Sequence, residues 1–144
     1  MLRRTEIERA AAFRFALRKF VARTGVVAAE AGLTSQRYDL LLAIKAGQDE
    51  TATPTELSEQ LSLNQTAVSE LVRRAEEAGL ISREASPEDG RVSFLRLTAE
   101  GEERLGTAFL GLRADRSQLV QSFDELESRF RDSTARSAAR RRRT

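Results

Sequence analysis

Residues 53–80 read TPTELSEQLSLNQTAVSELVRRAEEAGL, and this stretch decides the fold. At its start, the side-chain oxygen of Thr53 can accept a hydrogen bond from the amide of the third helical residue, and Glu56 can reach back to the amide of Thr53. Pro54 stands at the first helical position, where its missing N–H has no consequence. This capping-box pattern predicts that a short helix begins at Pro54.

A second helix is expected directly after the first. The short helix is interrupted at residues 62–64, where Asn64 can cap a helix over residues 65–78 and Gly79 can end it. The apolar spacing predicts that the two helices clamp each other at a steep angle. The residues of this apolar set are Leu57, Leu61, Leu63, Val68 and Leu71.

A short β-hairpin is expected after this helix pair. Residues 80–84 and 91–97 are typical of strands, and the turn residues Pro87, Asp89 and Gly90 lie between them. Thr98 then offers an N-cap for another helix. Helix, three-residue turn, helix and hairpin together predict a mainly α fold with a small β-hairpin, the winged helix-turn-helix.

Two helices are expected before this module. Apolar residues recur every three or four positions from Ile7 to Val21, which predicts a helix over residues 5–30 that ends near Gly32. Thr34 or Ser35 can cap a second helix, and Gly47 is placed to end it. The polar run over residues 48–53 is expected to be a loop.

The C-terminal part carries a heptad pattern. Its seam has the spacing 4, 3, 4, 3, 4, 3, 4 and consists of Leu105, Phe109, Leu112, Arg116, Leu119, Phe123, Leu126 and Phe130. The pattern favours packing on a helix of a second chain, and the alternative is packing on the chain's own core. A second capping-box pattern at Ser122 leaves a bend there as another alternative.

The chain has 144 residues, which is enough for a single domain with one hydrophobic core. Its composition limits the chemistry that it can perform. With no cysteine and no histidine, thiol nucleophiles, thiolate or imidazole metal sites and the commonest general base are excluded. We expect no enzyme, no metal and no cofactor. No apolar stretch predicts a membrane span or signal peptide, so we expect a soluble, cytoplasmic protein without a membrane partner.

Charge is distributed unevenly along the chain. Five arginines, Arg136 and Arg140 to Arg143, lie in the last nine residues, and the rest of the chain carries a net charge of −3. This basic tail either extends the last helix or is disordered, and it can add sequence-independent affinity for DNA or only solubility.

The second helix of the pair presents a polar outer face. Short hydrogen-bonding side chains and arginine suit a major groove, where they can contact base edges. The residues of this face are Gln65, Thr66, Ser69, Glu70 and Arg73. The alternative is an ordinary solvated helix face, but its position between a capped helix pair and a hairpin favours DNA.

The sequence resembles the MarR-type winged helix-turn-helix transcriptional regulators. The resemblance rests on residues 54–61 and 68–80, and above all on Asp89-Gly90-Arg91 followed by Leu97-Thr98-Ala99-Glu100-Gly101. It implies a homodimeric repressor of transcription that binds a pseudo-palindromic operator on double-stranded DNA. Residues 1–33 and 105–135 would be dimerisation helices, 34–104 the DNA-binding lobe and 136–144 the basic tail.

The resemblance also implies roles for individual residues. Asp89 would orient Arg91 at the wing tip, and Arg91 would enter the minor groove. The implied DNA-binding set is Asn64, Gln65, Thr66, Ser69, Arg73, Arg74 and Arg91. Three residues depart from the family pattern or from what DNA favours. Ser62 replaces a common turn glycine and Ser58 a small alanine, and Glu70 would be unfavourable near phosphates unless it accepts a hydrogen bond from cytosine.

Such regulators commonly respond to a small aromatic ligand, to oxidants or to metals, and the missing cysteine and histidine leave either a small-molecule ligand or no effector. The candidate pocket residues are Phe13, Leu17, Tyr38 and Leu41, which could equally be core. The alternative function for the whole chain is a helical interaction or scaffold protein that uses the heptad seam.

Overall fold

The structure is a computed structural model that describes residues 1–142, apart from the side chain of Ser133. Arg143 of the predicted basic tail therefore lies outside the described residues. The chain forms two compact units. One is built from residues 1–24 together with Leu112 and the residues that follow it, and the other is Gly25–Gly111.

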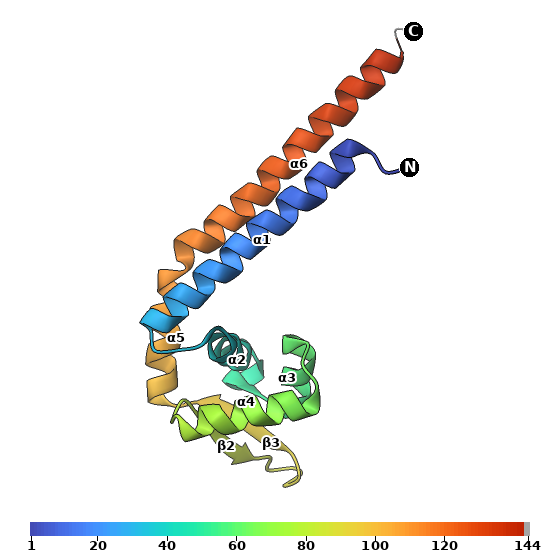
Figure 1. Cartoon of the computed structure of the whole chain (residues 1–144). Helices are drawn as coiled ribbons and strands as arrows, with labels where there is room; N and C mark the ends of the chain where they lie inside the picture. Colours follow the sequence, from blue (N-terminus) through green and yellow to red (C-terminus); the bar gives the residue numbers. More distant parts are fainter. Residues whose placement is uncertain (143–144) are drawn as a thin grey trace. The chain divides into compact units, whose positions relative to one another are not determined.

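The unit Gly25–Gly111 is a winged helix-turn-helix lobe, as the sequence predicts (Figure 1). Its three-stranded antiparallel sheet has the order β1-β3-β2. Its elements are α2 (Ser35–Lys45), η1 (Gln48–Glu50), β1 (Thr51–Ala52), α3 (Pro54–Leu61), α4 (Gln65–Glu77), β2 (Ile81–Ala85), β3 (Ser93–Leu97) and α5 (Ala99–Gly111). Residues 25–30, which form the end of α1 (Arg4–Glu30), also belong to this unit.

The predicted helix boundaries are confirmed by the capping hydrogen bonds. Glu56 N donates to Thr53 Oγ1 over 3.2 Å, and Thr53 N donates to the Glu56 carboxylate over 3.3 Å. Asn64 Oδ1 accepts from Ala67 N over 2.8 Å at the start of α4. Thr34 and Thr98 cap α2 and α5 in the same way, because each side chain satisfies an amide that lacks a partner within its helix.

The prediction of a plain loop over residues 48–53 is wrong. Residues 48–50 form a 3₁₀ turn, and Thr51 and Ala52 pair with Arg96 and Leu95 as a third strand. Two residues are too few for an alternating pattern, so only the pairing with β3 reveals this strand. The hairpin strands also differ from the prediction at their ends: β2 covers Ile81–Ala85 instead of residues 80–84, and β3 begins at Ser93 instead of Arg91.

The core of the lobe joins its helices to its sheet. Leu40, Leu41 and Ile44 of α2 are fully buried, as are Leu57 of α3 and Leu95 of β3. From α4, Val68 and Val72 face the same core. Because α4 buries this stripe, its opposite face is directed to solvent.

The other unit pairs the N-terminal part of α1 with α6 (Arg113–Arg141), and the two helices run antiparallel, side by side (Figure 1). The rings of Phe13 and Phe123 stack with centroids 4.7 Å apart. The Arg9 guanidinium lies 5.3 Å from the centroid of the Phe130 ring. The seam residues Phe123 and Phe130 therefore contact α1 of the same chain, which was the alternative to a partner chain.

The heptad seam does not lie on one continuous helix. Helix α5 ends at Gly111, Leu112 adopts φ −95° and ψ 0°, and α6 begins at Arg113. The bend considered at Ser122 is absent, because α6 runs through this residue and Ser122 Oγ donates to Gln118 O over 2.8 Å. The heptad spacing describes only where apolar side chains recur in the sequence. It continues from α5 into α6 and therefore does not reveal the helix break at Leu112.

Candidate nucleic-acid interface

The exposed face of α4 contains the polar residues that the sequence singles out. Gln65, Thr66 and Ser69 are exposed, and so are Arg73 and Arg74. They lie opposite the buried stripe of Val68, Leu71, Val72 and Ala75. Asn64 is exposed at the N-terminal end, where its side-chain oxygen serves as the cap. A single helix therefore presents six of the seven predicted DNA-binding residues to solvent.

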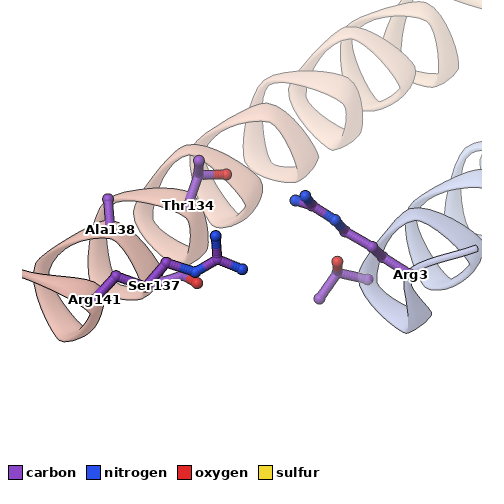
Figure 2. A pocket seen from close by; sticks show the side chains of 6 residues that line it. Arg3, Thr134, Ser137, Ala138 and Arg141 are labelled. Atoms are coloured by element: carbon purple, nitrogen blue, oxygen red, sulfur yellow. The ribbon is translucent and has the colours of Figure 1, made fainter. Parts of the chain in front are cut away.

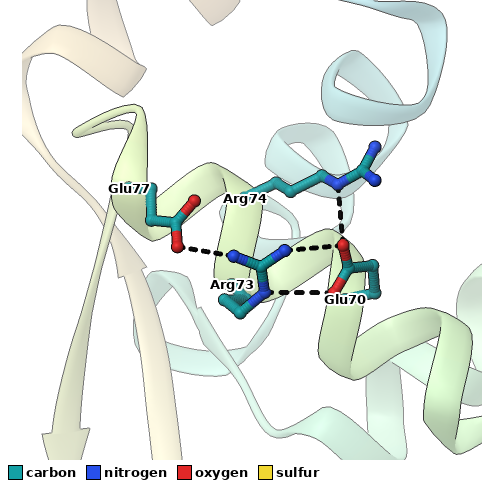
Figure 3. A network of polar contacts seen from close by, with 4 residues as sticks. All are labelled: Glu70, Arg73, Arg74 and Glu77. Atoms are coloured by element: carbon teal, nitrogen blue, oxygen red, sulfur yellow. Dashed lines mark hydrogen bonds and ion pairs between the residues drawn. The ribbon is translucent and has the colours of Figure 1, made fainter.

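Glu70 lies at the centre of an ion-pair network on this face (Figure 3). Its Oε1 accepts from Arg73 Nη2 over 2.7 Å and from Arg74 Nε over 2.8 Å, and its Oε2 accepts from Arg73 Nε over 3.0 Å. Arg73 Nη1 also donates to Glu77 Oε1 over 2.6 Å. These contacts join all four charged side chains drawn in Figure 3.

The network shifts the titration of its members. Hydrogen bonds from Arg73 first, and then from Arg74, lower the pKa of Glu70 to about 2. The same contacts with Glu70 and Glu77 raise the pKa of Arg73 above its ordinary value. From the sequence, Glu70 is a charge near phosphates or an acceptor for cytosine, and its pairs with Arg73 and Arg74 are not predicted. The spacing of Glu70 to Arg73 and Arg74, three and four residues, was the signal for these pairs.

The hairpin carries the seventh predicted residue at its tip. Arg91 is exposed, with 94% of its side chain accessible. Asp89 Oδ1 accepts from the Arg91 backbone amide over 3.0 Å and from Arg91 Nε over 3.3 Å. The predicted contact of Asp89 with Arg91 is therefore present. Its effect on DNA binding stays a prediction.

Two further ion pairs, which the sequence did not predict, involve the hairpin: one joins it to α4, and the other joins its two strands. Arg83 of β2 donates to Glu76 of α4 over 2.7 Å. Arg96 of β3 donates to Glu84 over 3.1 Å and to the carbonyl oxygen of Asp49 over 3.0 Å. The first of these pairs links the base of the wing directly to α4, so the two candidate DNA-contacting elements are coupled.

The turn between α3 and α4 accommodates both serines that depart from the family pattern. Ser62 adopts a left-handed conformation with φ 53° and ψ 43°, the conformation for which glycine is common. The hydroxyl of Ser58 donates to the carbonyl oxygen of Leu63. Ser58 therefore helps to close the turn that sets α4 relative to α3.

The candidate ligand-pocket residues are distributed over the two units. Tyr38 and Leu41 are buried in the lobe. Phe13 stacks on Phe123 in the two-helix unit, where Leu17 is half-buried. The ligand pocket stays a prediction.

A cleft of about 380 Å³ lies between the end of α6 and the start of α1. Figure 2 shows Arg3 facing Thr134, Ser137 and Arg141 across it. Its polar, cationic lining is unlike that expected for an aromatic ligand.

Comparisons with known proteins agree with this geometry. A sequence model described as the MarR family matches residues 31–92. The solved structure of Sco3205, a MarR family transcriptional regulator from Streptomyces coelicolor in complex with DNA, is 25% identical, with a TM-score of 0.72 over 96% of this chain and 92% of that one.

The chain is similar to MarR-family regulators in sequence over residues 31–92 and in its fold.

Curated proteins similar to this chain come from Bacillus subtilis (strain 168). The uncharacterised HTH-type transcriptional regulator YdcH is 35% identical over 60% of this chain and 60% of its own length. The HTH-type transcriptional repressor YetL is 25% identical over 67% of this chain and 58% of its own length. The chain spans about half the length of the curated relatives it matches.

Proposed function

We propose that this chain is a MarR-type, sequence-specific, double-stranded-DNA-binding regulator of transcription. The observation that carries the proposal is the fully polar outer face of α4, held opposite a buried apolar stripe and linked to a wing that exposes Arg91. The complex of Sco3205 with DNA supports a DNA partner, and the name of YetL supports repression.

The two elements would divide the work of recognition. Helix α4 would enter the major groove, where Gln65, Thr66 and Ser69 can hydrogen-bond to base edges. The positive end of its dipole lies at Asn64 and favours a nearby phosphate. Arg91, oriented by Asp89, would enter the adjacent minor groove, where the negative potential of narrow A·T stretches attracts arginine.

A homodimer would place two such lobes on a pseudo-palindromic operator. Apolar side chains remain exposed on the terminal helices: Phe15 and Val21 of α1 are 69% and 62% exposed, and Val120 of α6 is 60% exposed. Burying them against a second copy would stabilise a dimer by about 25 cal/mol for each Å² of apolar surface removed from water. Two α4 helices about 34 Å apart would then match successive major grooves.

We expect the chain to act as a repressor in the cytoplasm. A dimer bound to a promoter can block RNA polymerase without any further protein. Release by a small aromatic ligand is the further expectation from the family resemblance.

The test is fluorescence anisotropy with the chain's own promoter-region DNA and a scrambled duplex over a salt series, with the mass in solution measured alongside. We expect a dimer that binds the promoter duplex about 10³-fold or more tighter than the scrambled one. A dimer with only sequence-blind, salt-sensitive binding would contradict the proposal. It would favour the helical interaction protein instead.

Arg91→Ala tests the role of the wing. The variant should bind the promoter duplex more weakly, and the slope of log K against log salt should flatten by about one for the lost phosphate-region contact. Arg129→Ala on α6 is the matched control, because it removes the same charge from outside the lobe. Equal binding by Arg91→Ala and this control would exclude Arg91 from the interface.

A further inference from the structure

The arginines of α4 are already paired with anions of their own helix. Glu70 contacts both Arg73 and Arg74, and Glu77 contacts Arg73 from the other side (Figure 3). Two carboxylates and two guanidinium groups leave this part of the helix with no net charge. A helix that binds DNA mainly through phosphates would bind more tightly with a net positive charge.

The remaining donors of the two arginines are unequal. A guanidinium has five N–H groups. Arg73 uses three of them, two on Glu70 and one on Glu77. Arg74 uses only Nε on Glu70, so its terminal nitrogens extend beyond the ion pair. Glu70 therefore orients both side chains, and it holds Arg73 the more completely.

We propose that Glu70 is a specificity-determining residue, which competes with DNA phosphates for Arg73 and Arg74 and thereby weakens sequence-independent binding. The proposal rests on the proposed function in DNA binding. It assigns to Glu70 a positive role, where the sequence alone showed an unfavourable charge or an acceptor for cytosine.

The physical reason is an exchange of partners. When either arginine turns to a phosphate, one ion pair replaces another, and the Glu70 carboxylate is left beside a polyanion. A sequence-independent complex has only phosphate contacts to offset this repulsion. An operator complex adds hydrogen bonds to base edges, each bidentate pair discriminating by about 1–3 kcal/mol. Base-edge contacts can hold α4 on an operator while the two arginines stay paired with Glu70, whereas a sequence-independent complex has to break these pairs. The penalty therefore falls more heavily on the wrong sequence.

The carboxylate cannot escape this role by protonation near neutral pH. The pKa of Glu70 is about 2, because hydrogen bonds from Arg73 and Arg74 stabilise its charged form. Glu70 is thus ionised wherever the protein is expected to bind DNA.

The experiment compares Glu70→Gln with the parent on operator and scrambled duplexes over a salt series. Glu59→Gln is the matched control, since Glu59 is an exposed residue of the preceding helix and loses the same charge. We expect Glu70→Gln to bind scrambled duplex about tenfold more tightly and operator less than threefold more tightly. Its salt slope for scrambled duplex should steepen by about 0.9 per arginine released to a phosphate.

Glu70→Asp provides the rescue, because it keeps the charge and should keep the parent's salt slope. Circular dichroism of each variant checks that α4 remains helical. Equal tightening on both duplexes, or tightening no greater than that of Glu59→Gln, would overturn the inference while leaving the proposed function intact. Failure of the parent to bind either duplex would instead overturn the proposed function, and the inference with it.

Discussion

Ser62 occupies the tight turn between α3 and α4 in a conformation that l-residues rarely adopt. With φ 53° and ψ 43°, it places its Cβ close to the backbone, which costs about 1 kcal/mol for a residue other than glycine. The turn is nevertheless closed by hydrogen bonds, since Leu63 N donates to Ser58 O over 3.1 Å. A local conformational cost is thus accepted where the angle between two helices is set.

Ser62→Gly should raise the free energy of unfolding by about 1 kcal/mol, because glycine adopts the same backbone angles without the Cβ contact. Urea unfolding followed by circular dichroism measures the change. Ser69→Gly is the control in a regular helix, where glycine should destabilise by about 0.5 kcal/mol. Destabilisation by Ser62→Gly would show that the serine side chain holds the turn.

Asp39 on α2 gives the protein a pH dependence opposite to that of most carboxylates. Although Asp39 is exposed, neighbouring groups partly desolvate its carboxyl and raise its pKa above the usual 3.8, because desolvation disfavours the charged form. The native state therefore binds a proton at higher pH than the unfolded state. This residue's contribution to stability consequently increases as the pH falls through its native pKa toward 3.8.

Asp39→Asn removes that dependence and should be more stable than the parent at pH 7. The difference between the two proteins should narrow as the pH is lowered toward 3.8. Urea unfolding of both proteins at several pH values measures it, and the subtraction cancels the titration of carboxyl groups common to both. A difference that widens toward acid pH would contradict the assigned sign.

At the scale of elements, α5 begins unusually close to the chain that leads into β2. The Leu80 carbonyl oxygen accepts from Thr98 N over 3.0 Å, and Thr98 Oγ1 donates to Gly79 O over 2.6 Å. A Cβ at Gly101 would overlap the Leu80 carbonyl oxygen. The glycine in the family-like motif that ends at residue 101 is therefore required by packing.

Gly101→Ala should destabilise the lobe by about 1–3 kcal/mol, because backbone must shift to admit the methyl group. Gly106→Ala in the same helix is a matched control, since nothing lies within 4 Å of a Cβ there. It should stabilise by up to about 1 kcal/mol through helix propensity. Urea unfolding of both variants distinguishes packing from propensity, and similar effects of the two would refute the packing argument.

The elements differ in how well their sequence predicted them. Helices α2, α3, α4 and α5 carry Thr, Asn or Pro signals at their first residues, and the structure confirms each start. Strand β1 and the break at Leu112 had no such signal. Strand β1 depends on pairing with β3, which is distant in sequence, so the residues adjacent to β1 do not specify it.

At the scale of the whole molecule, the exposed apolar residues of α1 bear on assembly. Phe15 is 69% exposed although its neighbour Phe13 stacks on Phe123. Helix α1 packs one face against α6 and exposes large apolar side chains on another face. Such an exposed apolar face is typical of a protein–protein interface. This surface supports the proposed homodimer better than the heptad seam, whose Phe123 and Phe130 contact α1.

Phe15→Glu should shift the protein from dimer toward monomer, because the interface would have to bury an unpaired carboxylate. Sedimentation velocity over a range of concentrations measures the shift. Gln60→Glu on α3 introduces the same charge into the lobe and should leave the mass unchanged. A Phe15→Glu variant as dimeric as the parent would remove this face of α1 from the interface.

The sequence by itself determined the helix-turn-helix, the hairpin, the caps and the residues that face outward from α4. Each of these depends on hydrogen bonds and periodicity among residues close in the chain. Only the tertiary structure decided that the C-terminal seam contacts α1, that β1 completes the sheet and that Glu76 couples α4 to Arg83 of the wing. These contacts join residues that are distant in sequence. Hydrogen bonds and periodicity within a short segment do not determine which distant segment it packs against.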